Sequence, residues 1–324
     1  MEENTEQRVD LTLFSEKIQE LKDRIASVIV GQEQTVDLVL TAILANGHVL
    51  IEGVPGVAKT LLARLTARLI DADFSRVQFT PDLMPSDVLG TTVFNMKTNG
   101  FDFHQGPIFA DIVLVDEINR APAKTQAALF EVMEERQISI DGTTHRMGDL
   151  YTILATQNPV EQEGTYKLPE AQLDRFLMKI TMDYPSTDEE VEILLRHQAS
   201  AAFTRVDRLE PLLTPADLAT LRDAAQQVRV EASLLRYIAE IVDTTRHSKA
   251  VYLGASPRAA VAILSSAKAY ALLQERDFVT PDDIKTVAPF VMHHRLLLTA
   301  EAEMQGYTPL QVALRLIDKV EVPQ

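Results

Sequence analysis

A ten-residue stretch, IEGVPGVAKT at Ile51 to Thr60, constrains the fold of this chain more than any other feature. It continues the apolar run from His48 to Ile51, which predicts a strand, and it leads into a helical pattern from Thr60 to Ile70. Strand, loop and helix in this order are the setting in which the pattern G-x-x-x-x-G-K-[ST] binds phosphate. The sequence therefore predicts an α/β domain with a phosphate-binding loop at the start of a helix.

Each part of this loop has its own predicted role. Backbone N–H groups at the helix N-terminus face the anion, Lys59 reaches the outer phosphates, and the hydroxyl of Thr60 binds Mg²⁺. Ala58 stands where the pattern expects a second glycine, and we expect its methyl group to be tolerated because the backbone stays right-handed. A plain Gly-Pro turn is the alternative. The predicted nucleotide-binding residues of the loop are Gly53, Val54, Pro55, Gly56, Val57, Ala58, Lys59 and Thr60.

Short apolar runs alternate with helical patterns in the first part of the chain, which predicts a mostly parallel sheet covered by helices. Further strands are predicted at residues 76–79, 112–115, 151–155 and 177–181. After Pro185 we find only helical patterns, at residues 188–199, 215–228, 232–247, 257–274 and 281–298. We therefore divide the chain into a flexible N-terminus (1–10), an α/β nucleotide-binding domain (11–184) and a smaller all-α domain (185–324).

Two hairpins are predicted to project from the α/β domain. One turns at Thr98-Asn99-Gly100 and the other at Asp141-Gly142. Phe101 and Phe103 alternate onto one face of the first hairpin. Packing of that face on its own domain is the first expectation, and contact with a polypeptide is the alternative.

An apolar strand from Asp111 ends in two adjacent carboxylates, Asp116 and Glu117. Successive strand residues point to opposite faces, so one carboxylate can bind the metal while the other turns toward the γ-phosphate. We predict that Asp116 holds Mg²⁺ and that Glu117 orients or deprotonates water. An acidic turn exposed to solvent is the alternative when the pair is taken alone.

A third strand, from Tyr151 to Thr156, ends in Gln157-Asn158-Pro159. With this order of motifs the chain resembles the AAA+ ATPases. The resemblance implies that Asn158 contacts the γ-phosphate and the attacking water. By local chemistry alone, an Asn-Pro turn remains open.

Two arginines acquire roles through the same resemblance. Arg175, in LPEAQLDRF, resembles the arginine finger offered to a neighbouring subunit, and Arg258, in GASPRA, resembles the second sensor on the helical lid. Arg258 also follows Ser256 and Pro257, which read as N-cap and first helical residue, and a helix dipole disfavours a cation there unless an anion binds. On spacing alone, an ion pair of Arg175 with Glu170 or Asp174 is an equal alternative.

Longer matches narrow the family. They are IVGQ, TPDLMPSDVLG, LVDEINRAPAKTQAALFEVMEERQ and ATQNPVEQEGTYKLPEAQLDRF, and together they resemble the MoxR subfamily over nearly all of residues 10–300. The hairpins resemble the helix-2 insert and the pre-sensor-1 hairpin of the clade that contains magnesium chelatase and the replicative helicases. By analogy, Val30, Gly31 and Gln32 would line the adenine pocket.

Composition excludes several other classes. A net charge of −16 disfavours general nucleic-acid binding. The chain has no cysteine, which fits a reducing compartment, and its polar, acidic start and lack of long apolar runs lead us to expect a soluble cytoplasmic protein without membrane insertion. The histidines show no zinc spacing, and we expect His293-His294 to be a solvated surface pair.

The resemblance implies Mg²⁺-dependent ATP hydrolysis in a homo-oligomeric ring, expected to be a hexamer, that remodels or matures client proteins. Proteins with von Willebrand factor A domains are expected partners. The main rival is a DNA-translocating motor, which predicts basic hairpin tips, and Lys97 and Arg146 lie near those tips. A scaffold that only binds nucleotide would not need Glu117. A GTPase is disfavoured because the N-K-x-D motif is absent.

Overall fold

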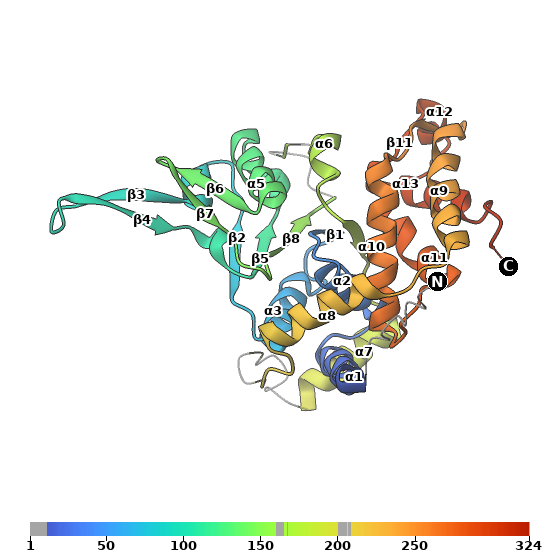
Figure 1. Ribbon diagram of the computed structural model, residues 1–324, viewed down its shortest axis with the longest axis horizontal. Coiled ribbons are helices and arrows are strands. Elements are labelled where there is room, and N and C mark those ends of the chain that lie inside the picture. Colours follow the sequence, from blue (N-terminus) through green and yellow to red (C-terminus); the bar gives the residue numbers. More distant parts are fainter. Residues whose placement is uncertain (1–11, 160–164, 167, 200–205, 207–208, 324) are drawn as a thin grey trace, which may run out of the picture.

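The computed structural model describes residues 12–159, 165–166, 168–199, 206 and 209–323. Its centre is a five-stranded sheet in the order β2-β5-β8-β1-β9, with every neighbouring pair parallel (Figure 1). The strands are β1 (Val49–Gly53), β2 (Phe74–Gln78), β5 (Ile112–Asp116), β8 (Thr152–Gln157) and β9 (Met178–Met182). The parallel sheet predicted from the apolar runs is confirmed, with strand ends slightly displaced.

Helices cover both faces of this sheet. The helices of this first part of the chain are α1 (Thr12–Val28), α2 (Glu33–Leu44), α3 (Lys59–Leu69), α4 (Pro85–Leu89), α5 (Ala123–Glu135) and α6 (Glu170–Leu173), and α7 (Thr187–Ala199) follows β9. Because successive strand residues face opposite sides, Val49 and Ile51 join the core with α1, α2 and α3, whereas Leu50 joins a second core with α4 and α5. Strand β1, buried on both faces, therefore holds the loop that follows it firmly.

Both predicted hairpins are present. The first, β3 (Gly90–Asn95) with β4 (Gly100–Gln105), projects far from the body of the molecule (Figure 1). The second is β6 (Gln137–Ile140) with β7 (Thr143–Arg146). Its turn has positive φ at Asp141 and Gly142, the conformation that an Asp-Gly hairpin turn requires.

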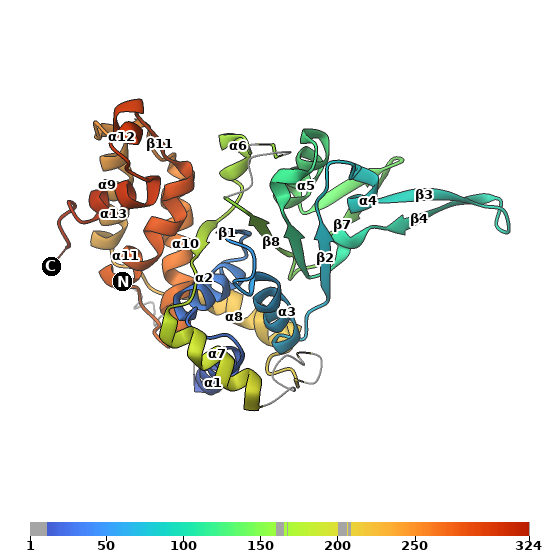
Figure 2. The ribbon, with the colours of Figure 1, turned by 180° about the vertical axis from the view of Figure 1, so that it is seen from behind.

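The second domain is a helical lid. Its helices are α8 (Pro215–Gln227), α9 (Ala232–His247), α10 (Pro257–Leu273), α11 (Pro281–Met292), α12 (Ala300–Met304) and α13 (Pro309–Ile317). Helix α10 packs beside α2, so the buried lid residues continue the core of the first domain (Figure 2). The division at residues 184 and 185 stays a prediction.

Three expectations for the lid are wrong. Strands do occur there, since β10 (Val251–Leu253) pairs with β11 (Leu297–Leu298). The helix predicted to reach Leu298 ends at Met292, where a 3-10 turn, η4 (His293–Arg295), begins. His293 and His294 are buried rather than solvated: His293 Nδ1–H donates to the carbonyl oxygen of Pro289 on α11, and His294 Nε2–H donates to that of Phe176, just before β9.

None of the helices among the described residues is long and apolar enough to cross a membrane.

Candidate nucleotide-binding site

The phosphate loop, the two carboxylates and Asn158 lie together at one edge of the sheet. Because β1, β5 and β8 are parallel neighbours, their carboxyl ends lie together, and we call this edge the carboxyl edge. The phosphate loop follows β1, Asp116 is the last residue of β5, and buried Asn158 directly follows β8. Residues that precede the strands lie at the opposite edge, the amino edge.

Backbone geometry explains two glycines of the loop and corrects one expectation. A Cβ on Gly53 would stand 2.6 Å from the carbonyl oxygen of Met182, so only glycine fits between β1 and β9. Gly56 has a φ of +90°, which glycine adopts without strain. Ala58 has φ 64° and ψ 20°, so the expected right-handed backbone is wrong. This left-handed alanine turns the chain into α3, at a conformational cost of about 1–2 kcal/mol.

Lys59 and Thr60 begin α3, directly after the loop. The Lys59 ammonium donates to the carbonyl oxygens of Gly53 at 2.5 Å and Val54 at 3.2 Å. Burial lowers the pKa of Lys59, while Asp116 and Glu117 act to raise it. The ammonium group is therefore held over the loop and faces the two carboxylates, where a bound phosphate would complete its charge balance.

Asp116 is buried and bonded on both oxygens. Arg76 Nε lies 2.6 Å from Oδ2, and the Thr156 hydroxyl donates to Oδ1 at 3.1 Å. The same hydroxyl accepts the backbone N–H of Glu117 at 3.0 Å. Thr156 thus ties the acidic end of β5 to the end of β8.

Glu117 leaves the strand in a left-handed conformation, with φ 56° and ψ 51°. Its Oε2 accepts from Gln78 Nε2 at 2.8 Å and pairs with Arg120 at 3.2 Å. The conformational break turns this side chain away from that of Asp116. The two carboxylates therefore have separate partners, and their predicted roles stay a prediction.

The sequence analysis missed Arg76, Gln78 and Thr156. Arg76 and Gln78 are two residues apart on strand β2 and therefore share one face of it. Strand β2 pairs in register with β5, so Gln78 lies opposite Asp116. A signal was present in Arg76-Val77-Gln78, where two polar residues flank a valine within the strand predicted at residues 76–79. Thr156 carried a weaker signal, as a hydroxyl residue at the end of an apolar strand.

The three residues proposed for adenine lie between α1 and α2. Gly31 has a φ of +71°, and Gln32 donates from Nε2 to the carbonyl oxygen of Asp183 at 3.3 Å, just beyond β9. A Cβ on Gly31 would collide with the carboxyl group of Glu189 on α7. Val30 to Gln32 are thus placed next to the end of β9 and the first turns of α7.

Arg175 and Arg258 lie elsewhere, at the amino edge. Arg175 precedes β9 and Arg258 lies in the first turn of α10. Arg175 pairs with Glu134, and Arg258 lies 3.5 Å from Glu134 and 3.7 Å from Asp174. The alternative considered from the sequence, an ion pair of Arg175 with Glu170 or Asp174, named the wrong partner, because Arg175 pairs with Glu134. We call these two arginines and two carboxylates the arginine cluster.

Arg295 fixes the segment that carries Arg175. Its guanidinium group is buried, pairs with Asp174 at 2.6 Å and donates to the carbonyl oxygens of Asp174, Phe176 and Leu177. Burial lowers the pKa of Arg295, and Asp174 partly offsets this effect. Arg295 was missed because nothing in its local sequence indicates a distant carboxylate.

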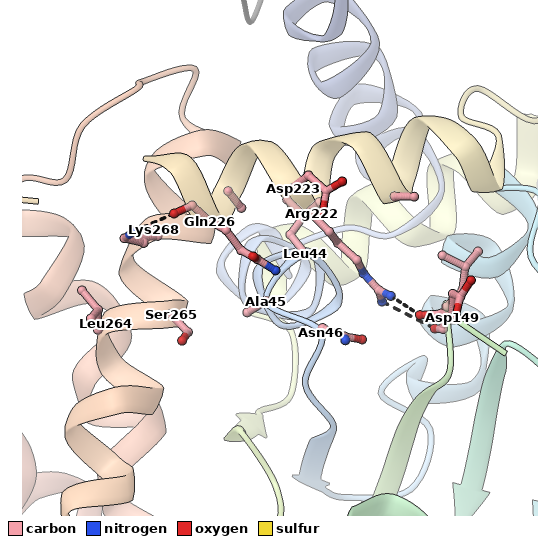
Figure 3. Close-up of a pocket in the computed structure, with 13 residues that line it drawn as sticks. Leu44, Ala45, Asn46, Asp149, Arg222, Asp223, Gln226, Leu264, Ser265 and Lys268 are labelled. Atoms are coloured by element: carbon pink, nitrogen blue, oxygen red, sulfur yellow. Dashed lines mark hydrogen bonds between the residues drawn. The ribbon is translucent and has the colours of Figure 1, made fainter. Parts of the chain in front are cut away.

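Two adjoining hollows run along the amino edge beside α10. The arginine cluster opens into one of about 580 Å³, which Arg136 and Val261 also line. The other, of about 540 Å³, is shown in Figure 3. There Arg222 points from α8 to the carbonyl oxygen of Asp149, at 2.6 Å, and Lys268 donates to that of Gln226. These two cations bond main-chain oxygens, which indicates a structural role.

Comparison with known proteins places these sites in context. The model of the ATPase family associated with various cellular activities (AAA) matches residues 48–178, and the AAA lid domain matches residues 243–313. The protein YeaC of Bacillus subtilis is 48% identical over 301 residues, which are 93% of either chain. Chaperone MoxR1 of Mycobacterium tuberculosis is 44% identical over 309 residues, covering 93% of this chain and 81% of its own length. A crystal structure of a Cytophaga hutchinsonii protein matches with a TM-score of 0.89 at 40% identity, over 97% of both chains.

Proposed function

Because this chain belongs to the AAA ATPases, and among them to the chaperone-like MoxR type, we propose that two copies share each ATP site and that hydrolysis remodels client proteins. ATP hydrolysis follows from the membership of the chain in this family. The sharing of sites is inferred from the positions of Lys59 and the arginine cluster. A ring of copies, six by the family resemblance, would let every copy contribute to two sites.

One observation carries this proposal. Lys59 lies at the carboxyl edge of the sheet, whereas Arg175 and Arg258 lie at the amino edge. Strand β1 separates the two edges with five residues, a length of roughly 16 Å at about 3.3 Å per residue. This separation supports a site in which the arginines of one copy meet the nucleotide of the next. In this proposal Arg258 acts together with Arg175 on the nucleotide of the neighbouring copy. A lid sensor considered alone would instead act on the nucleotide of its own copy.

The residues at the carboxyl edge fit Mg²⁺. Thr60 and Asp116 offer hard oxygen donors near Lys59. Within the described ranges, no group of three or more His, Cys, Asp or Glu side chains gathers around one point. Such a sparse set suits Mg²⁺, which keeps water ligands and takes phosphate oxygens. We assign Thr60 and Asp116 to the ion, which when bound would neutralise charge on the outer phosphates.

The remaining groups divide the reaction among them. Lys59 binds the outer phosphates, Glu117 takes the proton of the attacking water, and Asn158 orients that water. Val30, Gly31 and Gln32 hold the adenine ring. Gln78 and Arg120 fix the Glu117 carboxylate before the nucleotide arrives.

A mixing experiment tests the shared site. Lys59→Ala removes nucleotide binding but leaves the arginines, whereas Arg175→Ala leaves binding but removes the arginine, and each variant alone should lose about 10³-fold in ATP turnover. In an equal mixture, random neighbours should make about a quarter of the sites complete. A mixture no more active than its two components would contradict the shared site.

The projecting hairpin supports a protein client. Phe94 and Phe101 stack edge to face at 5.3 Å between ring centroids, and Phe101 and Met96 are 72% and 81% exposed. Phe103 instead packs on Phe109 and on His145 of the second hairpin, so only this phenylalanine follows the expected packing on its own domain. Exposed apolar side chains suit a polypeptide better than a phosphate backbone.

Capture of the client tests this part of the proposal. Glu117→Gln should stop turnover while ATP stays bound, which prolongs the client-bound state. A pull-down from cell extract with this variant and ATP should hold defined proteins after nuclease treatment, and proteins with von Willebrand factor A domains are the expected candidates. Loss of the captured material with nuclease would favour a DNA motor, with Lys97 and Arg146 as its contacts.

A further inference from the structure

Helix α7 is packed on the protein by its polar side. Glu189 lies against Gly31, and Arg196 donates to the carbonyl oxygens of Ala26 and Ser27 at 3.0 and 2.9 Å. Arg196 also pairs with Glu192 at 2.5 Å. Both ribbon views place α7 beside α1 at the lower margin of the molecule (Figures 1 and 2). Positions 189, 192 and 196, spaced by three and four residues, therefore form the inward side of the helix.

The apolar side of α7 faces outward. Val191, Leu194 and Leu195 are 49%, 68% and 54% exposed, and their spacing of three and four residues aligns them in one stripe, which we call the α7 stripe. A surface helix normally buries its apolar stripe and exposes its polar side. The α7 stripe reverses this arrangement, and exposed apolar clusters of this kind mark interaction sites.

We propose that the α7 stripe binds a second copy of this chain, on the face that carries Arg258. The inference rests on the shared site proposed above. Helix α7 borders Gly31, so it forms part of the rim of the nucleotide site, and that rim is what the neighbouring copy must approach to bring its arginines to the phosphates.

The neighbour's face is complementary in both apolarity and charge. Val261, one turn beyond Arg258 on α10, is 64% exposed and supplies an apolar contact. The exposed side chains of Asp188 and Glu190 flank the start of the α7 stripe, opposite in sign to Arg258, whose side chain is 70% exposed. The stripe on one copy and α10 on the next are different surfaces, so the contact repeats head to tail, as a closed ring requires.

Assembly is the first test. In the Glu117→Gln background with ATP, Leu194→Asp should sediment as a monomer and still bind ATP, because the charge lies on the outer side of the helix. The matched control is Met304→Asp, at a lid position that is 85% exposed, and it should assemble like its parent. Parental assembly by Leu194→Asp protein would overturn the inference.

A cysteine probe gives a second test that does not depend on disrupting the contact. The chain has no cysteine, so Leu194→Cys or Met304→Cys introduces a single thiol. With ATP, the thiol at position 194 should react with a thiol reagent at least about tenfold more slowly at assembling than at dissociating concentrations, while that at 304 stays unchanged. Equal protection at both concentrations would show that the chain covers the stripe itself, and no protection would exclude the contact.

These outcomes separate the inference from the proposed function. Recovery of turnover in the Lys59→Ala and Arg175→Ala mixture, with no protection at position 194, would leave the shared site standing and reject the α7 contact. Protection at position 194 without recovery in the mixture would support the contact and reject the shared chemistry.

Discussion

Arg175 and Arg258 pair with one carboxylate, that of Glu134 at the end of α5. The two arginines come from different domains, since one precedes β9 and the other begins α10 of the lid. Glu134 therefore holds together two cations that would otherwise repel each other. Under the shared-site proposal, both arginines would instead meet the triphosphate of the neighbouring copy.

If Glu134 only stands in for that triphosphate, Glu134→Gln should leave ATP turnover of the assembled protein within about threefold of the parent. The ion pairs are partly exposed, so the loss of folding stability should stay below about 1 kcal/mol. Glu131→Gln, on the same helix and exposed, is the control. A loss of turnover comparable to that of Arg175→Ala would instead make Glu134 part of the assembled site.

Thr156 should matter through its hydroxyl group. Thr156→Val leaves the Asp116 Oδ1 atom and the backbone N–H of Glu117 without this partner, which should cost about 1–3 kcal/mol of stability and reduce ATP turnover. Thr156→Ser keeps the hydroxyl and should restore turnover. Thermal unfolding and ATP hydrolysis measured on both variants check this, and equal turnover in the two would rule out the role of the hydroxyl.

Ala58→Gly should relieve the left-handed strain at the end of the phosphate loop. The relief of about 1–2 kcal/mol is partly offset by the greater backbone freedom of glycine in the unfolded chain, about 0.5–1 kcal/mol. We expect a melting temperature equal to or slightly above that of the parent, with ATP binding retained. Ala63→Gly, inside α3, should destabilise by about 1 kcal/mol or more. Clear destabilisation by Ala58→Gly would refute the strain.

His48 should make the fold sensitive to acid. Burial, helped by Arg136, lowers the pKa of this histidine from 6.5 to about 4, so the unfolded chain binds more protons between these two values. His48 does not lower the free energy of unfolding well above pH 6.5. It lowers this free energy progressively as the pH drops towards 4, and causes no further loss below pH 4. The effect between pH 7 and pH 5 is about 2 kcal/mol.

Urea unfolding at pH 7 and pH 5 measures that effect. His48 accepts the N–H of Ile153 on Nδ1 and bonds the carbonyl oxygen of Met133 through Nε2, so glutamine is the closest replacement. His48→Gln should lose about 2 kcal/mol less than its parent on acidification. The control is His247→Gln, which removes a histidine whose side chain is exposed. Identical losses for parent and His48→Gln would exclude the buried histidine as the cause.

The carboxyl edge of the site was predictable because its signals are local. Lys59, Asp116 and Asn158 each end or follow an apolar strand, and parallel strands bring such ends together. The partners of these residues depend on strand order, which no single stretch of sequence contains. Arg76 and Gln78 are examples, since they reach the carboxylates only because β2 pairs with β5.

The lid was predicted less well, for the same physical reason. His293 and His294 are polar enough to suggest solvent, yet both are buried: His293 bonds the carbonyl oxygen of Pro289 on α11, and His294 bonds that of Phe176 in the first domain. The backbone of Ala58 could not be inferred either, because alanine favours right-handed conformations wherever its neighbours leave it a choice. In both cases, tertiary contacts override the local preference.

The separation of the phosphate loop from the arginine cluster also has a consequence for ATP consumption in the cell. A newly synthesised copy would carry every group that the reaction needs, yet the rigid sheet keeps those groups apart. Under the shared-site proposal, ATP consumption begins only when the concentration of the protein is high enough for copies to meet. Because the length of strand β1 keeps the loop and the arginines of one copy apart, unassembled chains would then hydrolyse little ATP.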